Sequence, residues 1–373
     1  MFRPTSCRCT SRDFSVAGLL LLLVIPAQAG IHLLFCPEGW IPALAGMTGK
    51  MSMRVLITGA NGQVGHELLR AFAGSAAERQ IVVATRGGTL EDGTRCEAID
   101  LADFDGLTRA LDRIAPDIIV NAAAYTAVDR AEDEPELAQR INGNAPGVVG
   151  AWAKQRGARV VHYSTDYVFD GTATRPYRET DATHPVSAYG RSKRSGEIAL
   201  RDSGAHHLIL RTAWVYAARG QNFLRTMLRL GAERDALRVV DDQIGAPTPA
   251  ALIADVTARI VAQWRTLPSI GRESPRSGGG MFAPDGTYHL VASGQTSWCG
   301  FAHAIFERAQ HAGLIEHVPG VHAINTADYP TKAKRPAFSV LDTTRLRETF
   351  GITLPDWQTG LDGVMRKLAG SRS

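Results

Sequence analysis

From residue 53 onward, short apolar runs alternate with longer amphipathic stretches. The apolar runs are Arg54–Thr58, Ile81–Thr85, Cys96–Leu101, Asp117–Val120, Arg159–Tyr163 and His207–Arg211. Between them, apolar residues recur at helical spacing near Gln63–Phe72, Phe104–Ile114, Glu136–Arg156 and Tyr189–Arg201. Short strands that alternate with helices are typical of a parallel sheet covered on both faces. The pattern therefore predicts an α/β fold with a doubly wound parallel sheet.

The pattern loosens after about residue 215. Helices are predicted at Phe223–Glu233, Ala250–Gln263, Trp298–Gln310 and Trp357–Leu368, and short strands at Leu237–Val240 and Tyr288–Val291. The segment Ser269–Gly286 is rich in glycine, proline and serine, which indicates a flexible insertion. We expect a sheet domain over residues 53–215 and a smaller C-terminal α/β lobe over residues 216–373. Some segments of the lobe are expected to return to the sheet.

Three glycines, Gly59, Gly62 and Gly65, follow the first predicted strand. They allow a tight turn, a close approach of the backbone to a ligand, and close packing of the next helix. That helix directs its free N–H groups at an anion bound on the turn. The spacing is G-x-x-G-x-x-G, and such a turn also occurs for packing alone. With a strand before it and a helix after it, the turn favours a dinucleotide site of the Rossmann type. The expected contact residues are Gly59, Asn61, Gly62, Gln63 and Val64.

The end of the second strand bears on the choice of dinucleotide. It runs Thr85-Arg86-Gly87 and has no carboxylate to hold the ribose 2′-hydroxyl of NAD. Arg86 suits a 2′-phosphate, which favours NADPH, and the alternative is a solvated loop arginine.

Two further segments are expected to border the cofactor. Asp100 and Leu101, at the end of the third strand, are expected to lie near the adenine. Ala122, Ala123 and Ala124 are small enough for a flat cofactor to lie against the backbone, although tight packing alone explains them equally well.

Tyr189 and Lys193 are four residues apart on a predicted helix, so their side chains share one face. An ammonium beside a tyrosine favours the phenolate and lowers its pKa. The tyrosine can then give a proton to a carbonyl oxygen while hydride reaches the carbon. Thr165, directly after a buried strand, offers a hydroxyl to the same oxygen. The Tyr-x-x-x-Lys spacing is weak by itself, because an exposed helical pair has it too. Together with the glycine turn it predicts a dehydrogenase or reductase.

These segments resemble the extended short-chain dehydrogenase/reductases, and within them the dTDP-4-dehydrorhamnose reductase family. The resemblance extends from Met53 to about Leu368. Its blocks are Gly62–Gly65, Asn121–Asp129, Ser164–Phe169, Tyr189–Lys193, Arg211–Tyr216, Asp242–Thr248 and Tyr329–Pro336. The last three blocks separate this family from epimerases and dehydratases of the same fold.

The resemblance implies Thr165, Tyr189 and Lys193 as catalytic residues, with Lys193 also on the nicotinamide ribose. It implies NADPH-dependent reduction of the 4-keto group of dTDP-4-dehydro-L-rhamnose, and the family also uses NADH to some degree. The residues expected on the substrate are Thr126, Val128, Asp166, Tyr167, Trp214, Gln243 and Arg335. One alternative is another nucleotide-linked 4-keto sugar. A second is a catalytically silent regulatory subunit of the same fold, which has no need of all three catalytic residues.

Some relatives form dimers around a magnesium ion held by glutamates. Glu67 matches one of these glutamates, but residues 233–236 lack the expected second acidic pattern. We therefore expect no metal, and either a monomer or a homodimer.

Composition excludes several kinds of partner. The net charge of +4 is small and spread out, so no basic tract calls for nucleic acid or an acidic membrane. Three of the five cysteines, Cys7, Cys9 and Cys36, precede residue 53. The other two, Cys96 and Cys299, do not form a disulfide framework.

The first 52 residues have the layout of a secretory signal. Arginines precede the apolar run Val16–Ile25, and Ala27-Gln28-Ala29 follows it. The run is too short to span a bilayer. Met51 and Met53 lie directly before the first strand, and residues 25–31 are nearly repeated at residues 41–47. We interpret residues 1–52 as an over-long gene model rather than a signal, and expect a cytoplasmic enzyme.

A shortened chain that begins at Met53 should match the full chain in melting temperature and activity. Met53 enters the first strand at once, and a central parallel strand needs no upstream partner. With the leader attached, Val16–Ile25 should lower solubility, because it exposes a contiguous apolar patch. N-terminal sequencing of the protein from its native cell checks the start. A start at Met51 or Met53 agrees with this interpretation, and a start at Gly30 contradicts it.

Overall fold

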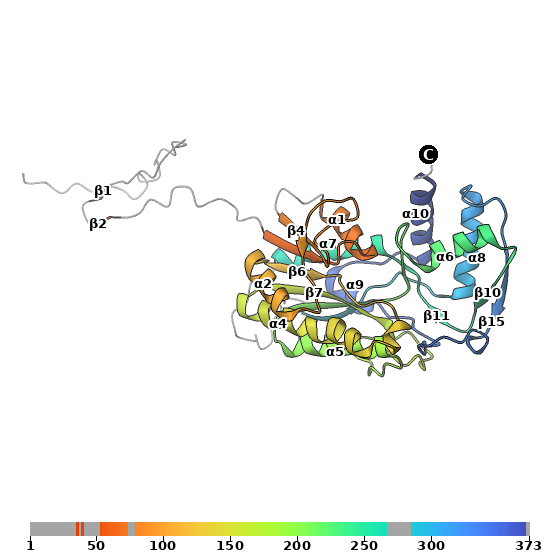
Figure 1. Cartoon of the computed structure of the whole chain (residues 1–373), viewed down its shortest axis with the longest axis horizontal. Helices are drawn as coiled ribbons and strands as arrows, with labels where there is room; N and C mark the ends of the chain where they lie inside the picture. Colours follow the sequence, from red (N-terminus) through yellow and green to blue (C-terminus); the bar gives the residue numbers. More distant parts are fainter. Residues whose placement is uncertain (1–34, 37–38, 41–52, 74–78, 267–284, 371–373) are drawn as a thin grey trace, which may run out of the picture. The chain divides into compact units, whose positions relative to one another are not determined.

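The computed structural model describes residues 35–36, 39–40, 53–73, 79–266 and 285–370. The chain divides into two compact units, Met1–Met51 and Ser52–Ser373. In the first unit, β1 (Phe35–Cys36) and β2 (Gly39–Trp40) form a short antiparallel pair. All the elements discussed below belong to the second unit (Figure 1). Most of the predicted leader, and residues 269–284 of the predicted insertion, lie outside the described residues.

Within the described residues, a seven-stranded parallel sheet forms the centre of the second unit. Its order is β13-β8-β7-β6-β3-β4-β5. The strands are β3 (Met53–Thr58), β4 (Arg79–Thr85), β5 (Glu97–Ala98), β6 (Ile118–Asn121), β7 (Arg159–Thr165), β8 (His206–Thr212) and β13 (Gly286–His289). This is the Rossmann strand order. From β3 the chain adds β4 and β5 toward one edge of the sheet, and then adds β6, β7, β8 and β13 toward the other edge. The predicted α/β fold with a doubly wound parallel sheet is confirmed.

Helices cover both faces of this sheet (Figure 1). The α-helices of the described residues are α1 (Gln63–Ala73), α2 (Phe104–Ile114), α3 (Pro135–Ala138), α4 (Ala145–Arg156), α5 (Ala188–Asp202), α6 (Phe223–Glu233), α7 (Ala250–Thr266), α8 (Trp298–His311), α9 (Thr344–Phe350) and α10 (Trp357–Gly370). On one face, α2, α4 and α5 enclose a core that includes Leu56 and Ile119. On the other, α1 and α7 enclose Val55 and Val120. Burial on both faces explains why the strands are apolar throughout rather than alternating.

Two predicted elements differ from those observed. The third strand was expected over Cys96–Leu101, but β5 contains only Glu97 and Ala98. The continuous helix expected from Glu136 to Arg156 is interrupted by a π-helical turn, Gln139–Asn144. This turn contains Asn142, whose side-chain amide bonds both the backbone N–H and the carbonyl of Tyr125 at 2.9 Å. The amide thereby fixes the loop that follows β6.

The C-terminal lobe is built on a separate parallel pair, β10 (Ala236–Val240) with β15 (Gly320–Ile324). Helices α6, α8 and α10 pack around Phe301 and Phe306 to form its core. In the described part of the second unit, two shorter pairings also lie outside the main sheet. They are β9 (Val215–Tyr216) with β12 (Thr248–Pro249), and β11 (Ile244–Gly245) with β14 (Thr296–Ser297). The strand predicted at Tyr288–Val291 overlaps β13, which pairs with β8 at the edge of the main sheet. It is a segment of residues 216–373 that returns to the main sheet; such returns were expected, but no segment was specified. Strand β15 and helix α9 were not predicted. No helix of the described residues is long and apolar enough to cross a membrane.

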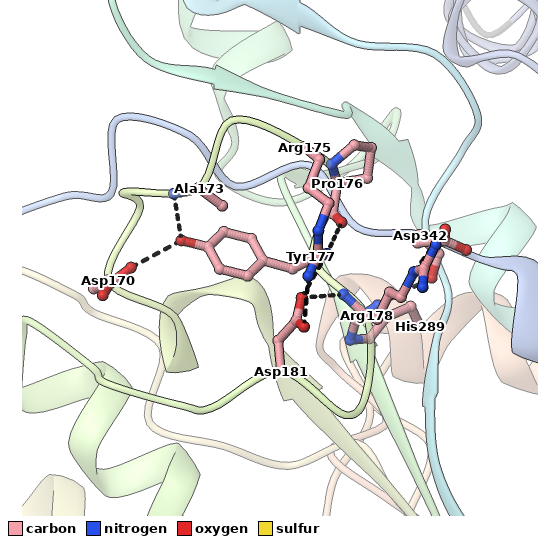
Figure 2. Close-up of polar contacts among 9 residues, drawn as sticks. All are labelled: Asp170, Ala173, Arg175, Pro176, Tyr177, Arg178, Asp181, His289 and Asp342. Carbon is pink, nitrogen blue, oxygen red and sulfur yellow. Dashed lines mark hydrogen bonds and ion pairs between the residues drawn. The ribbon is translucent and has the colours of Figure 1, made fainter.

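The polar loop before α5 is held by the hydroxyl of Tyr177 (Figure 2). This hydroxyl donates to Oδ1 of Asp170 at 2.8 Å and accepts from the backbone N–H of Ala173 at 3.1 Å. Farther along the loop, Arg175 binds both carboxylate oxygens of Asp181 at 2.9 Å. The loop is therefore ordered by its own polar groups, although it contains no helix or strand.

Glu67 of α1 is buried where α1 meets α10, with only 3% of its surface exposed. Its Oε1 accepts from Nζ of Lys367 at 2.7 Å, and its Oε2 accepts from Nε of Arg70 at 2.8 Å. Burial by itself raises the pKa of Glu67, but the hydrogen bonds from Lys367 and Arg70 outweigh it, so the pKa is lowered. The charge of this carboxylate is thus balanced by two cations of the same chain.

Replacing Lys367 with methionine should lower the free energy of unfolding at pH 7 by about 1–2 kcal/mol. Arg70 then remains as the one strong partner of Glu67, and the half-exposed lysine is worth less than a fully buried one. Because the folded pKa of Glu67 is lowered, its ion pairs stabilise the fold above the unfolded pKa. That contribution is lost as the pH falls through the folded value. Urea unfolding should therefore show a smaller difference between wild type and K367M at acidic pH than at pH 7. The control is R366M, an exposed position on the same helix. An equal effect of K367M and R366M at pH 7 would contradict the pairing.

Candidate active site

The glycine turn after β3 approaches β6 more closely than any side chain permits. Gly59 has a φ of 70°, and a Cβ there would lie 2.6 Å from the backbone nitrogen of Ala123. A Cβ on Gly65 would lie 2.1 Å from the carbonyl oxygen of Gly59. Helix α1 begins at Gln63, directly after the turn, so its first N–H groups face outward at the carboxyl edge of the sheet. This cradle fits the phosphates of a dinucleotide.

Two residues of the turn are tied to neighbouring segments. Asn61 accepts from the backbone N–H of Glu91 at 3.2 Å and donates to the carbonyl of Thr89 at 3.0 Å. Gln63 accepts from Asn222 at 2.8 Å, and Asn222 also caps the start of α6. The turn is therefore held by the loop after β4 on one side and by the lobe on the other.

The other residues expected on the cofactor lie along the same edge. Arg86 directly follows β4 and is exposed, which fits both a 2′-phosphate contact and a solvated loop arginine. Asp100 is exposed and accepts from the backbone N–H of Ala102 at 2.9 Å. Leu101 is 5% exposed and belongs to the core. Ala122 and Ala123 are half-buried and Ala124 is exposed, so the segment after β6 presents backbone with small side chains.

Thr165 and Tyr189 meet where β7 ends and α5 begins. The hydroxyl of Thr165 donates to Oδ1 of Asp166 at 2.9 Å and accepts from the N–H of Tyr167 at 3.1 Å. Ser187 caps α5, which places Tyr189 in its first turn. The pKa of Tyr189 is raised to about 12, chiefly by burial and then by the charge of Asp166, while a hydrogen bond with Thr165 acts in the opposite direction. The expectation that this pKa is lowered is therefore wrong for this structure, and Tyr189 is held in its protonated form.

The Lys193 ammonium does not offset this rise in the pKa of Tyr189, because its hydrogen bonds go to other groups. Its Nζ donates to the carbonyl of Tyr163 at 2.6 Å and lies 3.4 Å from Nε2 of His162. Burial lowers the pKa of Lys193 to about 8, and Glu197 opposes the decrease. Lys193 thus shares the face of α5 with Tyr189, as predicted, but its hydrogen bonds go to β7.

The side expected to face the substrate begins at Tyr167. Its ring packs edge-on against that of Tyr189, with centroids 5.7 Å apart. Burial, followed by Asp166, raises the pKa of Tyr167, and the charge of Arg335 opposes this rise. Arg335 in turn binds both oxygens of Asp129, at 3.1 Å and 2.7 Å. The structure thereby links Tyr189 to Arg335, a residue 146 positions later in the sequence.

Arg335 also lines a cavity of about 630 Å³ in the C-terminal lobe. Its walls come from α6, β10, the start of α8 and the segment 324–335. The lining residues are Phe223, Thr226, Met227, Leu230, Arg234, Ala236, Leu237, Arg238, Val239, Val240, Gln243, Trp298, Ile324, Asp328, Tyr329, Thr331 and Arg335. Of the residues predicted on the substrate, the cavity includes Gln243 and Arg335.

Aromatic rings form one wall of this cavity. Trp298 stacks on Trp214 with centroids 3.5 Å apart and an interplanar angle of 3°. Its indole N–H donates to Oε1 of Gln243 at 3.2 Å, and Gln243 donates to Thr326 at 3.0 Å. Trp214 has a φ of 48°, a strained conformation for a tryptophan. Trp214 therefore lies behind Trp298 and supports it.

The remaining predicted substrate residues differ in exposure. Asp166 is 1% exposed, and burial raises its pKa to about 6 against hydrogen bonds from Ser339 and Thr165. Thr126 is exposed and Val128 is half-buried, both in the loop between β6 and α3.

The residues present do not fit the magnesium site of some relatives. Both carboxylate oxygens of Glu67 are taken by Lys367 and Arg70. In the part of the chain that the structure describes, no group of three or more histidine, cysteine, aspartate or glutamate side chains could hold a metal ion.

Several residues of the site were not singled out from the sequence. Phe223, Trp298, Arg234 and Arg238 line the cavity, and Asp129 holds Arg335. Asp129 lies inside a block that carries the family resemblance, which was an available signal. Arg234 precedes β10 and Arg238 lies within it, and neither differs from a surface arginine in the sequence.

Comparison with known proteins agrees with this geometry. The model of the family described as the RmlD substrate binding domain matches residues 53–369. A dTDP-4-dehydrorhamnose reductase of Burkholderia thailandensis is 47% identical over 318 residues, which cover 85% of this chain and 99% of the relative. The Escherichia coli K12 protein of that name is 43% identical over 316 residues, which cover 85% and 98%.

A solved structure shares the fold. The crystal structure of dTDP-4-dehydrorhamnose reductase from Bacillus anthracis, in complex with NADP, superposes with a TM-score of 0.73 and is 32% identical. The match covers 85% of this chain and all of that one. Because the family model matches most of the chain and the relatives match over nearly their whole length, this chain belongs to the RmlD family of dTDP-4-dehydrorhamnose reductases.

Proposed function

We propose that this chain reduces the 4-keto group of dTDP-4-dehydro-L-rhamnose to a hydroxyl, with NADPH as the preferred cofactor. The observation on which the proposal rests is the grouping of Thr165, Tyr189 and Lys193 at the carboxyl edge of the sheet. Thr165 and Tyr189 share a hydrogen bond, and Tyr189 contacts Tyr167, whose pKa is influenced by Arg335, a residue that lines the cavity. The names of the relatives support the substrate, and the NADP complex of the Bacillus anthracis protein supports the cofactor.

The cofactor cradle is assigned to the turn after β3. When bound, a reduced nicotinamide supplies a hydride to the carbonyl carbon. The N–H groups at the start of α1 bind the pyrophosphate, and the absence of a Cβ at Gly59 lets it approach the backbone. Arg86 is exposed at the end of β4, where it binds the 2′-phosphate. Lys193 holds the nicotinamide ribose with the N–H that Tyr163 and His162 leave available.

Tyr189 supplies the proton. Its raised pKa keeps the phenol protonated at neutral pH, so it donates to the substrate oxygen as the carbonyl carbon is reduced. Thr165 donates a second hydrogen bond to the same oxygen, for which its hydroxyl turns away from Asp166. Lys193 stabilises the phenolate that remains and returns a proton to it.

The lobe cavity is assigned to the nucleotide part of the substrate. Arg335 is pre-oriented by Asp129, and Arg234 and Arg238 add positive charge, which suits a diphosphate. Phe223 and Trp298 offer aromatic faces for a base. We place the reaction in the cytoplasm, where NADPH and nucleotide sugars are available.

Purified protein mixed with dTDP-4-dehydro-L-rhamnose and NADPH should consume the absorbance of the reduced nicotinamide. Tyr189→Phe should lower turnover by about 10²–10⁴-fold, because the proton donor is lost while the ring still packs. The control is Tyr216→Phe, which removes a buried hydroxyl in the lobe core and should leave turnover near wild type. More than about half the activity remaining in Tyr189→Phe would exclude this residue as the acid.

Arg86→Ala should weaken NADPH binding about ten- to a hundred-fold and NADH binding much less, since only NADPH has the 2′-phosphate. Fluorescence titration of the two reduced cofactors measures the difference. Arg95→Ala, which removes another exposed arginine of the same loop, should change neither affinity. Equal weakening of both cofactors by Arg86→Ala would show that this arginine does not contact the phosphate.

A further inference from the structure

A row of buried polar side chains crosses three strands at the centre of the sheet. Thr58, Asn121 and His162 are in-register partners on β3, β6 and β7. The hydroxyl of Thr58 donates to Oδ1 of Asn121 at 2.7 Å, and Nδ2 of Asn121 lies 3.2 Å from Nδ1 of His162. The three residues are 4%, 3% and 1% exposed. Partners in register point to the same face of a sheet, so the side chains form one continuous row.

Lys193 meets the end of this row from α5. Its Nζ lies 3.4 Å from Nε2 of His162 and donates to the carbonyl of Tyr163 at 2.6 Å. The residue is 3% exposed, so both contacts are shielded from water. An ammonium has three N–H groups. The carbonyl of Tyr163 takes one of them. When Nε2 of His162 accepts, it takes a second and leaves one for Tyr189 and the ligands.

The same face of the sheet is apolar immediately beside the row. Two residues earlier on each strand stand Leu56, Ile119 and Val160, which pack in the core under α2, α4 and α5. If these three side chains only filled space, apolar side chains could take their place. Replacing both partners of a buried hydrogen bond by apolar groups of the same shape changes the stability little. The buried polar side chains begin at the level at which Lys193 enters and continue toward the carboxyl edge with Ser164 and Arg211. A buried ammonium is the group that requires acceptors there.

The imidazole can pair with Lys193 in either protonation state of the amine. Burial, followed by the charges of Lys193 and His207, holds the pKa of His162 well below its usual range, so the ring stays neutral. With an ammonium, Nε2 accepts and Nδ1–H donates to the amide of Asn121. With a neutral Lys193 amine, Nε2–H of His162 donates to Nζ of Lys193, and the side-chain amide of Asn121 donates to Nδ1 of His162. The orientation of the Asn121 amide in this structure corresponds to this second pattern. A half-turn of the amide exchanges these two patterns, and the hydroxyl of Thr58 can pair with either end.

We propose that His162, supported by Asn121 and Thr58, is a positioning residue that holds the Lys193 amine in place and stabilises its charged form. This role rests on the function proposed above for Lys193. His162 is 1% exposed and its hydrogen bonds are with Asn121 and Lys193, so we assign its effect to Lys193.

Apart from H207F, the variants below leave the other charged and titratable groups near the pair unchanged. Glu197 lies one turn along α5 and is bound by Arg211 of β8. His207 of β8 is near His162, and Asp166 is near Tyr189. A change caused by a substitution at His162 therefore reports on the contact with Lys193.

The experiment is the pH dependence of kcat/KM for H162F and H162Q in the full chain, together with their NADPH affinity and melting temperature. Wild type should lose activity above about pH 8 as Lys193 loses its proton. In H162F the ammonium has one acceptor fewer. The alkaline limb of the pH profile, where activity is lost, should therefore move to lower pH by about one unit, and NADPH should bind more weakly. In H162Q the side-chain oxygen can still accept, so the limb should stay near its wild-type position. H207F removes the neighbouring imidazole, which makes no hydrogen bond to Lys193, and should leave the limb in place.

The other possible results also decide whether His162 positions Lys193. An unchanged limb and unchanged NADPH affinity in a folded H162F would show that His162 only fills the core, and would overturn the proposal. If H162F does not fold, T58V decides in its place. Loss of the Thr58 hydroxyl should shift the alkaline limb in the same direction by a smaller amount, and no shift would overturn the proposal.

K193M separates the proposed function of the chain from the proposed role of His162. Activity retained in K193M would reject the proposed function, whereas activity lost in K193M with H162F unchanged rejects only the role of His162.

Discussion

The Lys193 ammonium is buried between α5 and the sheet, and much of the site is arranged around it. Removing such a charge from water costs several kcal/mol unless other groups compensate for it. Here the carbonyl of Tyr163 and the ring of His162 lie within reach, and Glu197 adds a negative charge one helical turn away. Glu197 is in turn bound by Arg211, with both side chains almost fully buried. These contacts exist because β7, β8 and α5 are packed together, which ties the surroundings of Lys193 to the fold.

A second constraint is the space between β3 and β6. Gly59 and Gly65 have no room for a Cβ, so the turn and the start of α1 lie directly against the backbone of the neighbouring strand. The strand order reverses at this position, and the opening lies at the carboxyl edge of the sheet. The glycine turn and the residues Thr165 and Tyr189 of β7 and α5 therefore share one edge of the sheet. The topology thus brings together the residues proposed to bind phosphate and the residues proposed to transfer the proton.

The lobe adds a ring of contacts from distant parts of the sequence. Asp129 orients Arg335, Trp298 stacks on Trp214, and Gln243 links Trp298 to Thr326. These groups hold one another before any ligand arrives, which lowers the entropic cost of binding. The electrostatic influence of Arg335 on Tyr167 and the contact of Tyr167 with Tyr189 join the lobe to the catalytic edge.

The sequence by itself determined the elements and the kind of site. Periodicity located α2 and α6 to the residue, because their apolar stripes and their boundaries are local. The glycine turn and the pair Tyr189 and Lys193 were also local signals, since their geometry is that of one turn and one helix face. Only the tertiary structure decided where β13 pairs, that Lys193 bonds β7 while Tyr189 has a raised pKa, and that Asp129 holds Arg335. Hydrogen bonds across strands and the loss of water around a charge depend on which distant segments pack together. No pattern within a single segment encodes that.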